Sequence, residues 1–138
     1  MSKDVESTTQ SLLVQLRILE AYYEDLVTRE SLLSQALLEN KAALTAVSSL
    51  PENHEMEIVV HIGGGLHIPV IFKPEKKLVV RLGAGIAIEK SKEDTVNFLS
   101  KRIEEIEKAL QEVIAQRNET LKRISVIRDE LNKLIKQK

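Results

Sequence analysis

The apolar residues in the first third of the chain recur at alternating spacings of four and three. This spacing predicts a helix over residues 7–49 that buries one narrow stripe, as in a coiled coil. Ser7 followed by Gln10 fits a capping box at its start, and Pro51 cannot continue the helix. The expected seam comprises Leu12, Leu16, Leu19, Tyr23, Leu26, Glu30, Leu33, Leu37, Asn40, Leu44 and Val47.

A second stripe of the same kind predicts a helix over residues 91–138, where Ser91 with Asp94 three residues later is a capping signal. Because the two stripes are similar in length, we expect the helices to fold back on each other as an antiparallel coiled coil. We also predict that Glu30 and Arg117, which interrupt the two seams, meet and fix the register. The second seam comprises Val96, Leu99, Ile103, Ile106, Leu110, Val113, Arg117, Thr120, Ile124, Ile127, Leu131 and Leu134.

Between the helices, residues 56–90 hold short runs of β-branched residues separated by turn signals. The runs Gly63-Gly64-Gly65 and Gly83-Ala84-Gly85 suit tight turns or bulges that need a positive φ. The pattern predicts two β-hairpins, so the fold class is α+β. Pro69 cannot donate to a strand ladder, which places its strand at a sheet edge or at a bulge.

Two hairpins this short do not make a stable sheet alone, and open strand edges are templates for pairing with other chains. We therefore expect the hairpins to join this chain to other subunits. The side chains expected to make that contact are Ile58, Val60, Ile62, Ile68, Val70, Val79, Leu82, Ile86 and Ile88.

Composition and charge narrow the possible functions. The formal net charge is −1 and the chain has no cysteine. Near neutrality disfavours a nucleic-acid binder, and the lack of thiols excludes disulfides and thiolate metal sites while fitting a reducing cytoplasm. No apolar run approaches the roughly 20 residues that a membrane-spanning helix needs. The polar N-terminus has no signal-peptide core, so we expect a cytoplasmic protein without a membrane partner.

The chain offers no clear catalytic or cofactor site. Its carboxylates lie at solvent-facing helical spacings without a nucleophile–base pair, so no enzymatic activity is predicted. The glycine runs lack the Lys-Ser/Thr of a P-loop and the third glycine of a dinucleotide fingerprint, so no cofactor is expected. His61 and His67 could meet across a hairpin, but no further ligand has a supporting spacing, and no metal site is predicted.

The two hairpin sequences carry a resemblance to a known family. The run from Ile58 to Gly65 resembles the first hairpin motif of archaeal-type prefoldin α-class subunits, and the run from Val79 to Lys90 resembles the second. Phe98, Lys101 and Arg102 at the start of the following helix are similar too. His61 departs from the pattern, since the family often has proline there. The resemblance covers essentially the whole chain, and two hairpins rather than one favour the α class.

This resemblance implies a hexamer of two α-class and four β-class subunits whose hairpins close into an intersubunit double β-barrel. Six coiled coils would project from it and hold non-native polypeptides at their tips. They would hand these polypeptides to a group II chaperonin without using ATP. The subunit would then be a holdase chaperone.

The two ends of the chain, which form the helix tips, carry more apolar residues than one seam requires. If the tips splay, these residues present a patch for unfolded segments, and otherwise they all pack against the facing helix. Both interpretations stay open, although Leu13, Val14 and Ile135 lie off the seam and favour exposure. The candidate client-binding residues are Leu12, Leu13, Val14, Leu16, Leu131, Leu134 and Ile135.

The C-terminal turns carry Arg128, Lys133, Lys136 and Lys138. These cations could steer docking to an acidic chaperonin surface, or could simply complement the helix dipole. An alternative to the chaperone is a structural scaffold or filament, in which the same β-driven assembly carries coiled coils that bind no clients. Apolar surface at the tips would distinguish the two functions.

Overall fold

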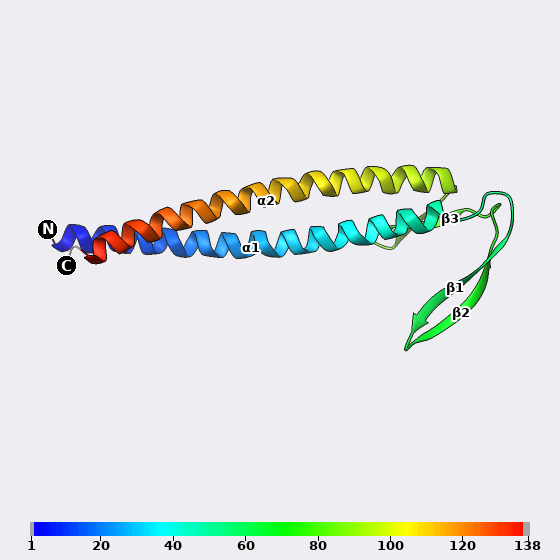
Figure 1. Cartoon of the computed structure of the whole chain (residues 1–138), viewed down its shortest axis with the longest axis horizontal. Coiled ribbons are helices and arrows are strands. Elements are labelled where there is room, and N and C mark those ends of the chain that lie inside the picture. Colours follow the sequence, from blue (N-terminus) through cyan, green and yellow to red (C-terminus); the bar gives the residue numbers. More distant parts are fainter. Residues whose placement is uncertain (1, 137–138) are drawn as a thin grey trace. The chain divides into compact units, whose positions relative to one another are not determined.

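The computed structural model describes residues 2–136 of the 138 and shows a helix, two hairpins and a second helix in chain order (Figure 1). This α+β architecture confirms the predicted fold class. The helices are α1 (Ser2–Ser48) and α2 (Lys92–Lys136). The strands are β1 (Met56–Gly63), β2 (Leu66–Phe72), β3 (Leu78–Gly83) and β4 (Ile86–Lys90).

The C-terminal end of α1 and the N-terminal end of α2 lie close to their predicted positions. Helix α1 ends at Ser48, just before Pro51, and the Asp94 backbone N–H donates to Ser91 Oγ over 3.1 Å at the start of α2. Helix α2 continues to Lys136, and the two residues beyond it lie outside the described part. The start of α1 differs, because the helix begins at Ser2 and runs through Ser7.

This earlier start has a simple physical reason. Residues 2–6 contain no glycine or proline, and Asp4 places a negative charge in the first turn, where the helix dipole favours it. The predicted capping box at Ser7 is therefore wrong as a helix start.

The predicted seams are the covered sides of both helices. Every seam position named above is buried or half-buried, and Leu26 is 0% exposed. Ion pairs fix the direction of pairing in the unit formed by residues up to Ala36 and from Ile106. Arg117 pairs with Glu30, and farther along α2 Arg128 lies 3.9 Å from Glu20, so the helices run antiparallel. The predicted contact between Glu30 and Arg117 is confirmed.

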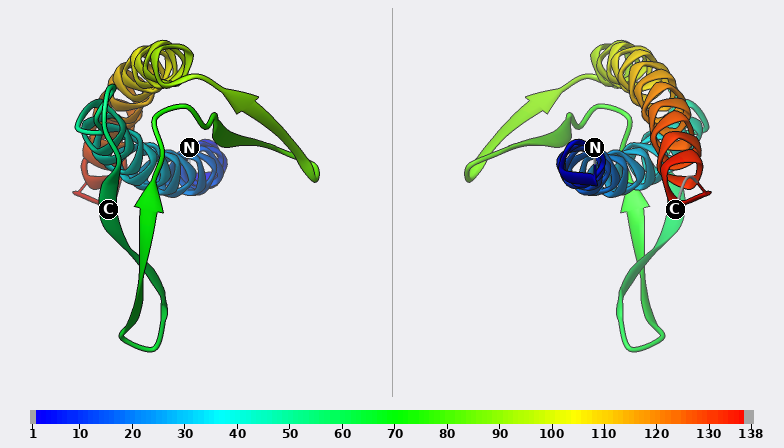
Figure 2. Two further views of the ribbon diagram at one scale, coloured as in Figure 1. Left: turned by 90° about the vertical axis from the view of Figure 1, so that its right-hand side faces the viewer. Right: turned by 90° about the vertical axis from the view of Figure 1, so that its left-hand side faces the viewer.

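The other unit, Leu37–Glu105, holds both hairpins as separate two-stranded antiparallel sheets, drawn as separate ribbons in Figure 2. In the first, His61 pairs with His67 and Val59 with Pro69, which confirms that the proline strand is an edge. In the second, Val80 pairs with Ile88.

Both hairpins turn in the same way. Each register shifts by one residue just before a two-residue turn, with the irregularity between His61 and Gly63 in one hairpin and between Arg81 and Gly83 in the other. The central turn residues Gly64 and Gly65 have φ of 58° and 76°, and Ala84 and Gly85 have 52° and 76°. Two positive φ values in succession define the type I′ turn, which matches the twist of the strands. The expected tight glycine turns are confirmed.

Candidate functional site

The first hairpin has one face that is entirely apolar. Because strand side chains alternate and cross-strand partners share a face, the pairs Ile58–Val70 and Val60–Ile68 lie together, with Met56 and Phe72 at the open end. Ile58 and Phe72 are half-buried and the other side chains of this face are exposed. Ile62, the remaining assembly candidate of this hairpin, lies at the bulge and is exposed. We call the face formed by Ile58, Val60, Ile68 and Val70 the apolar face.

The opposite face of this hairpin is mixed. It carries Glu57 opposite Ile71, then Val59 opposite Pro69, and finally the two histidines. Burying this face would remove a carboxylate and two imidazoles from water, whereas burying the apolar face would remove only hydrocarbon. The hairpin therefore has a preferred side for burial.

The second hairpin does not bring all its candidate assembly residues together. Leu78, Val80 and Ile88 share a half-buried face, Ile86 follows Ile88 on the same side, and Leu82 lies at the bulge. Val79 alone points the other way, where it pairs with Glu89 and is 67% exposed. The strand pattern contained this signal, since Val79 and Val80 are adjacent and must face opposite sides.

A stack of charged and aromatic groups links the second hairpin to α2. The Phe98 ring lies 5.4 Å from Lys90 Nζ and 5.0 Å from the Arg102 guanidinium carbon. Lys90 is the last residue of β4, so the stack ties the end of this strand to the second and third turns of α2. Lys92 adds a further tie by donating from Nζ to the Leu50 carbonyl oxygen over 2.7 Å.

At the tip, where the first turns of α1 lie beside the last turns of α2 (Figure 1), the candidate client-binding residues divide into two groups. Leu12, Leu16, Leu131 and Leu134 are seam residues, of which Leu131 is buried and the others are half-buried. The off-seam side chains are open, with Leu13 40%, Val14 56% and Ile135 64% exposed.

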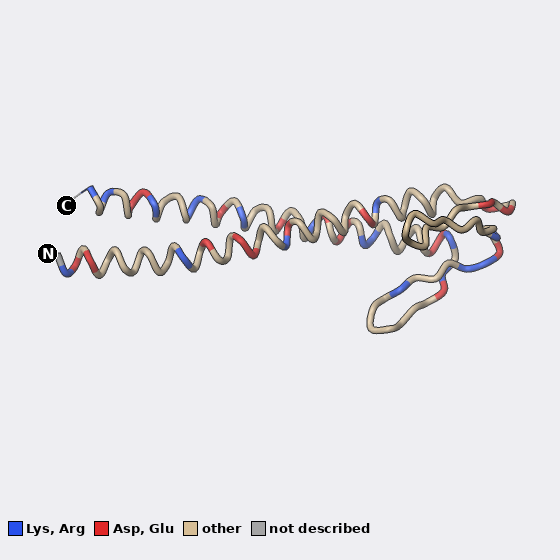
Figure 3. Tube along the Cα trace, turned by 90° about the horizontal axis from the view of Figure 1, so that it is seen from below, with Lys and Arg blue, Asp and Glu red and all other residues tan. Residues whose placement is uncertain are grey.

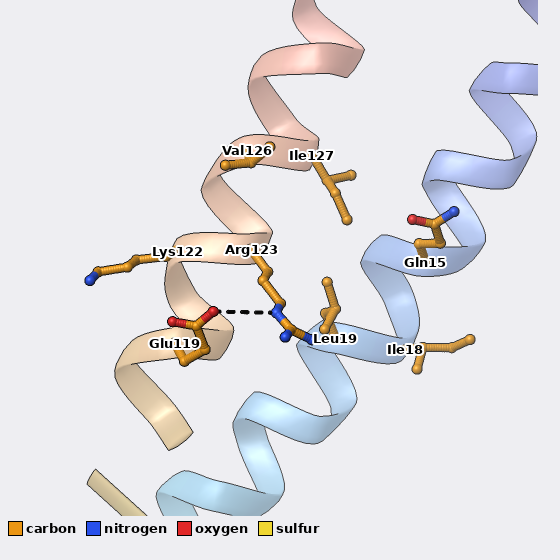
Figure 4. Close-up of a pocket in the computed structure, with 8 residues that line it drawn as sticks. All are labelled: Gln15, Ile18, Leu19, Glu119, Lys122, Arg123, Val126 and Ile127. Atoms are coloured by element: carbon orange, nitrogen blue, oxygen red, sulfur yellow. Dashed lines mark ion pairs between the residues drawn. The ribbon is translucent and has the colours of Figure 1, made fainter. Parts of the chain in front are cut away.

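A groove of about 560 Å³ lies next to these residues, between the two helices (Figure 4). Leu19 and Ile127 point inward at its floor, while Ile18 and Val126 lie on its outer sides and are exposed. Arg123 and Glu119 form an ion pair of 3.5 Å along its α2 side. Sequence reasoning missed Ile18 and Val126, although both are apolar residues outside the seam spacing.

The basic residues of the C-terminal turns are exposed. Arg128 reaches Glu20 at 3.9 Å, and Lys133 and Lys136 lie in the last turn of α2. The fourth predicted docking residue, Lys138, lies outside the described residues. Exposed pairs such as Arg128–Glu20 contribute little to stability, and all three described cations are exposed to solvent.

Within residues 2–136, no group of three or more His, Asp or Glu side chains is arranged to hold a metal ion. His61 and His67 do meet, with ring centroids 4.9 Å apart. Neither helix of the described part is long and apolar enough to cross a membrane. The arrangement offers surfaces for association: an apolar hairpin face, an exposed apolar tip and a basic turn.

Comparison with known proteins identifies the family to which this chain belongs. The sequence model of the family described as "Prefoldin subunit" matches residues 19–137. The prefoldin subunit alpha of Nitrosopumilus maritimus is 32% identical over 130 residues, covering 94% of this chain and 90% of that protein. That of Pyrococcus horikoshii is 27% identical over 120 residues, covering 86% and 81%.

A solved structure agrees with these relatives at the level of the fold. The prefoldin beta subunit from Thermococcus strain KS-1 aligns with a TM-score of 0.64 at 17% identity, covering 91% of this chain and 90% of that one. Membership of the family supports a chaperone-type function. Two hairpins between two antiparallel coiled-coil helices, together with these matches, show that the chain belongs to the prefoldin family, as an archaeal-type α-class subunit.

Proposed function

We propose that this chain is a subunit of an ATP-independent holdase. It captures non-native polypeptides at the tip of its coiled coil and delivers them to a group II chaperonin. Family membership supports a chaperone-type function, and the exposed apolar residues of the tip support capture at that place.

The observation that carries the proposal is the exposure of three apolar side chains at the tip, Leu13, Val14 and Ile135. Residues 7–16 contain no charged side chain, and this part of α1 is the uncharged stretch near the N-terminus in Figure 3. Exposed apolar side chains bind apolar segments of unfolded chains, because association removes both surfaces from water.

The groove beside the tip extends this surface along the coiled coil. Ile18 follows Val14 by four residues and therefore lies on the same side of α1. With Val126 across the groove, it gives a bound segment further apolar contacts. A client several residues long could contact the tip and the groove together.

Assembly is proposed through the hairpins. Two α-class and four β-class subunits would close them into a double β-barrel. The apolar face of the first hairpin supports this, because its alternation of Ile and Val suits an inner barrel surface. The candidate residues of the second hairpin, apart from Val79, support the same arrangement.

Delivery to the chaperonin would use the basic C-terminal turns. Lys133 and Lys136 are exposed in the last turn of α2, whereas Arg128 already lies near Glu20. If these cations steer docking to an acidic surface, the association rate falls as salt is added. A rate that salt does not change would remove the steering role and leave the capture proposal intact.

The experiment that tests capture is the aggregation of a denatured client protein, followed by light scattering. The test variant carries Leu13→Ser, Val14→Ser and Ile135→Ser. A matched control carries Leu32→Ser and Leu38→Ser, which are 63% and 71% exposed on α1 but distant from the tip. The mass of each assembly is measured in parallel.

The proposal predicts that the unaltered assembly and the control suppress aggregation, while the tip variant loses suppression at unchanged mass. If no assembly of intact mass suppresses aggregation, the chain is a structural scaffold instead. If the tip variant suppresses as well as the control, capture occurs elsewhere on the molecule.

A further inference from the structure

The first hairpin places two imidazole rings opposite each other just before its turn. His61 on β1 and His67 on β2 are cross-strand partners on the mixed face, and both side chains are exposed. Their ring centroids are 4.9 Å apart and the ring planes are inclined by 55°. We propose that these two residues form a binding site for a divalent transition metal of the Zn²⁺, Ni²⁺ and Cu²⁺ group.

The ring separation fits chelation. A histidine nitrogen lies about 2.0–2.1 Å from a bound zinc, and adding the radius of the ring puts the metal roughly 3.2 Å from each ring centroid. Two such rings at cis octahedral or tetrahedral angles have centroids about 4.5–5.2 Å apart. The observed 4.9 Å lies inside this interval. The cross-strand pairing therefore places the two rings at a separation that chelation allows.

The described neighbours of the two rings leave their nitrogens open to a metal ion. Within residues 2–136, neither imidazole takes part in a side-chain hydrogen bond or an ion pair. The neighbours on the same face are Val59 and Pro69, which carry no charge. Exposed rings can also turn about their side-chain bonds to direct a nitrogen at the metal without moving the strands.

The donor set selects the class of metal. Neutral imidazoles suit zinc, nickel and copper, whereas magnesium and calcium require oxygen ligands. The described part of the chain supplies no third His, Asp or Glu at this place, so water completes the coordination in one chain. The metal would then have two protein ligands, one on β1 and one on β2, rather than the four of a closed structural site.

A metal ion that bridges the two strands would stabilise the hairpin through which assembly is proposed. A ligand that binds only the paired strands shifts the equilibrium toward them by mass action. A two-stranded hairpin is marginal by itself, so a bond beside its turn is well placed to order it before subunits meet. The inference rests on the two histidines and holds whether or not the chain captures clients.

The test uses the full chain in its assembled form, stripped of metal by a chelator. ZnCl₂ is titrated by calorimetry, with MgCl₂ as the negative probe, and Cu²⁺ is added separately to record nitrogen couplings by electron paramagnetic resonance. We expect one Zn²⁺ per chain, no response to Mg²⁺, and a copper spectrum with two imidazole nitrogens. His61→Asn and His67→Asn should each weaken Zn²⁺ binding at least about tenfold, because the second donor of a chelate acts at high effective concentration.

The third histidine provides the matched control. His54 precedes β1 and is not paired with the other two, so His54→Asn should bind Zn²⁺ like the unaltered chain. Circular dichroism and assembly mass show whether each variant keeps its fold. Absence of saturable Zn²⁺ binding at millimolar metal would overturn the proposal. The proposal would also be overturned if all three substitutions weakened Zn²⁺ binding equally. A copper spectrum of the His61→Asn variant that still shows two imidazole nitrogens would overturn it as well.

Discussion

The helices of this chain cover their apolar seams, whereas the first hairpin leaves most of its apolar face exposed. In the helices, the predicted seams are covered by the facing helix, with Leu26 completely buried. In the first hairpin, the side chains of the apolar face form an equally regular pattern, yet Val60, Ile68 and Val70 stay exposed. Two helices can cover each other's stripes, whereas two strands side by side cannot cover the faces of their own sheet. The helices therefore stabilise the chain through their own contacts, whereas the first hairpin leaves an apolar face open, which supports the proposed assembly through it.

The largest expected effect comes from placing a charge on the apolar face of the first hairpin. Ile68→Asp should weaken subunit association by at least about a hundredfold, because a buried carboxylate without a partner is strongly unfavourable. Helix content should remain, since the seams are untouched. Analytical ultracentrifugation and far-ultraviolet circular dichroism measure the two effects.

Ile71→Asp is the control for this experiment. Ile71 lies on the same strand but on the mixed face, opposite Glu57. It should weaken association much less than Ile68→Asp. Equal loss of assembly from both variants would show that the apolar face is not the side of the hairpin that assembly buries.

In the helices, the expected effect of a substitution is on the chain's own stability. Leu26→Ala should lower the free energy of unfolding by about 3 kcal/mol, because it removes a fully buried side chain and leaves a cavity. Leu38→Ala, at a position 71% exposed, should change it by less than about 0.5 kcal/mol. Urea unfolding followed by circular dichroism compares them, and similar losses would contradict the seam assignment.

A smaller effect is expected at the polar layer of the seam. The Glu30 and Arg117 side chains are 21% and 30% exposed, so their attraction is only partly screened. A double-mutant cycle with Glu30→Ala and Arg117→Ala should give a coupling of about 1 kcal/mol in the free energy of unfolding. Additive single losses would mean that this pair does not fix the register.

The smallest effect is expected where hairpin and helix join. Phe98→Leu keeps most of the apolar volume but removes both cation–π contacts, which should cost about 0.5–1 kcal/mol. Arg102→Gln removes one of the two and should cost less. Urea midpoints measured on both variants test this order, and an unchanged midpoint for Phe98→Leu would show that the stack is incidental.

The helices and turns could be predicted because they depend on residues close together in the sequence. A seam spacing of four and three requires only the period of the helix, and the glycine turns require only positive φ at fixed positions. The contact between Glu30 and Arg117 followed from aligning two stripes of similar length. The start of α1 was missed because a capping motif at Ser7 is a preference that uninterrupted helix-forming residues override.

Parts of the candidate site could not be predicted from the sequence, because they depend on contacts between segments in the folded chain. Which side chains of β1 and β2 lie opposite each other on the apolar face depends on strand register, which the sequence does not state. The groove beside Ile18 and Val126 depends on how the surfaces of two helices come together. The distance between His61 and His67 depends on pairing across the turn, and on no motif within either strand.

The measurement that tests the central claim most directly is photo-crosslinking to a denatured client. A photoreactive amino acid replaces Val14 at the tip in one assembly and Leu38 in another, and both positions are exposed on α1. The account predicts client crosslinks from position 14 and few from position 38, at equal assembly mass. Equal crosslinking from both positions, or crosslinking from position 38 alone, would contradict capture at the tip.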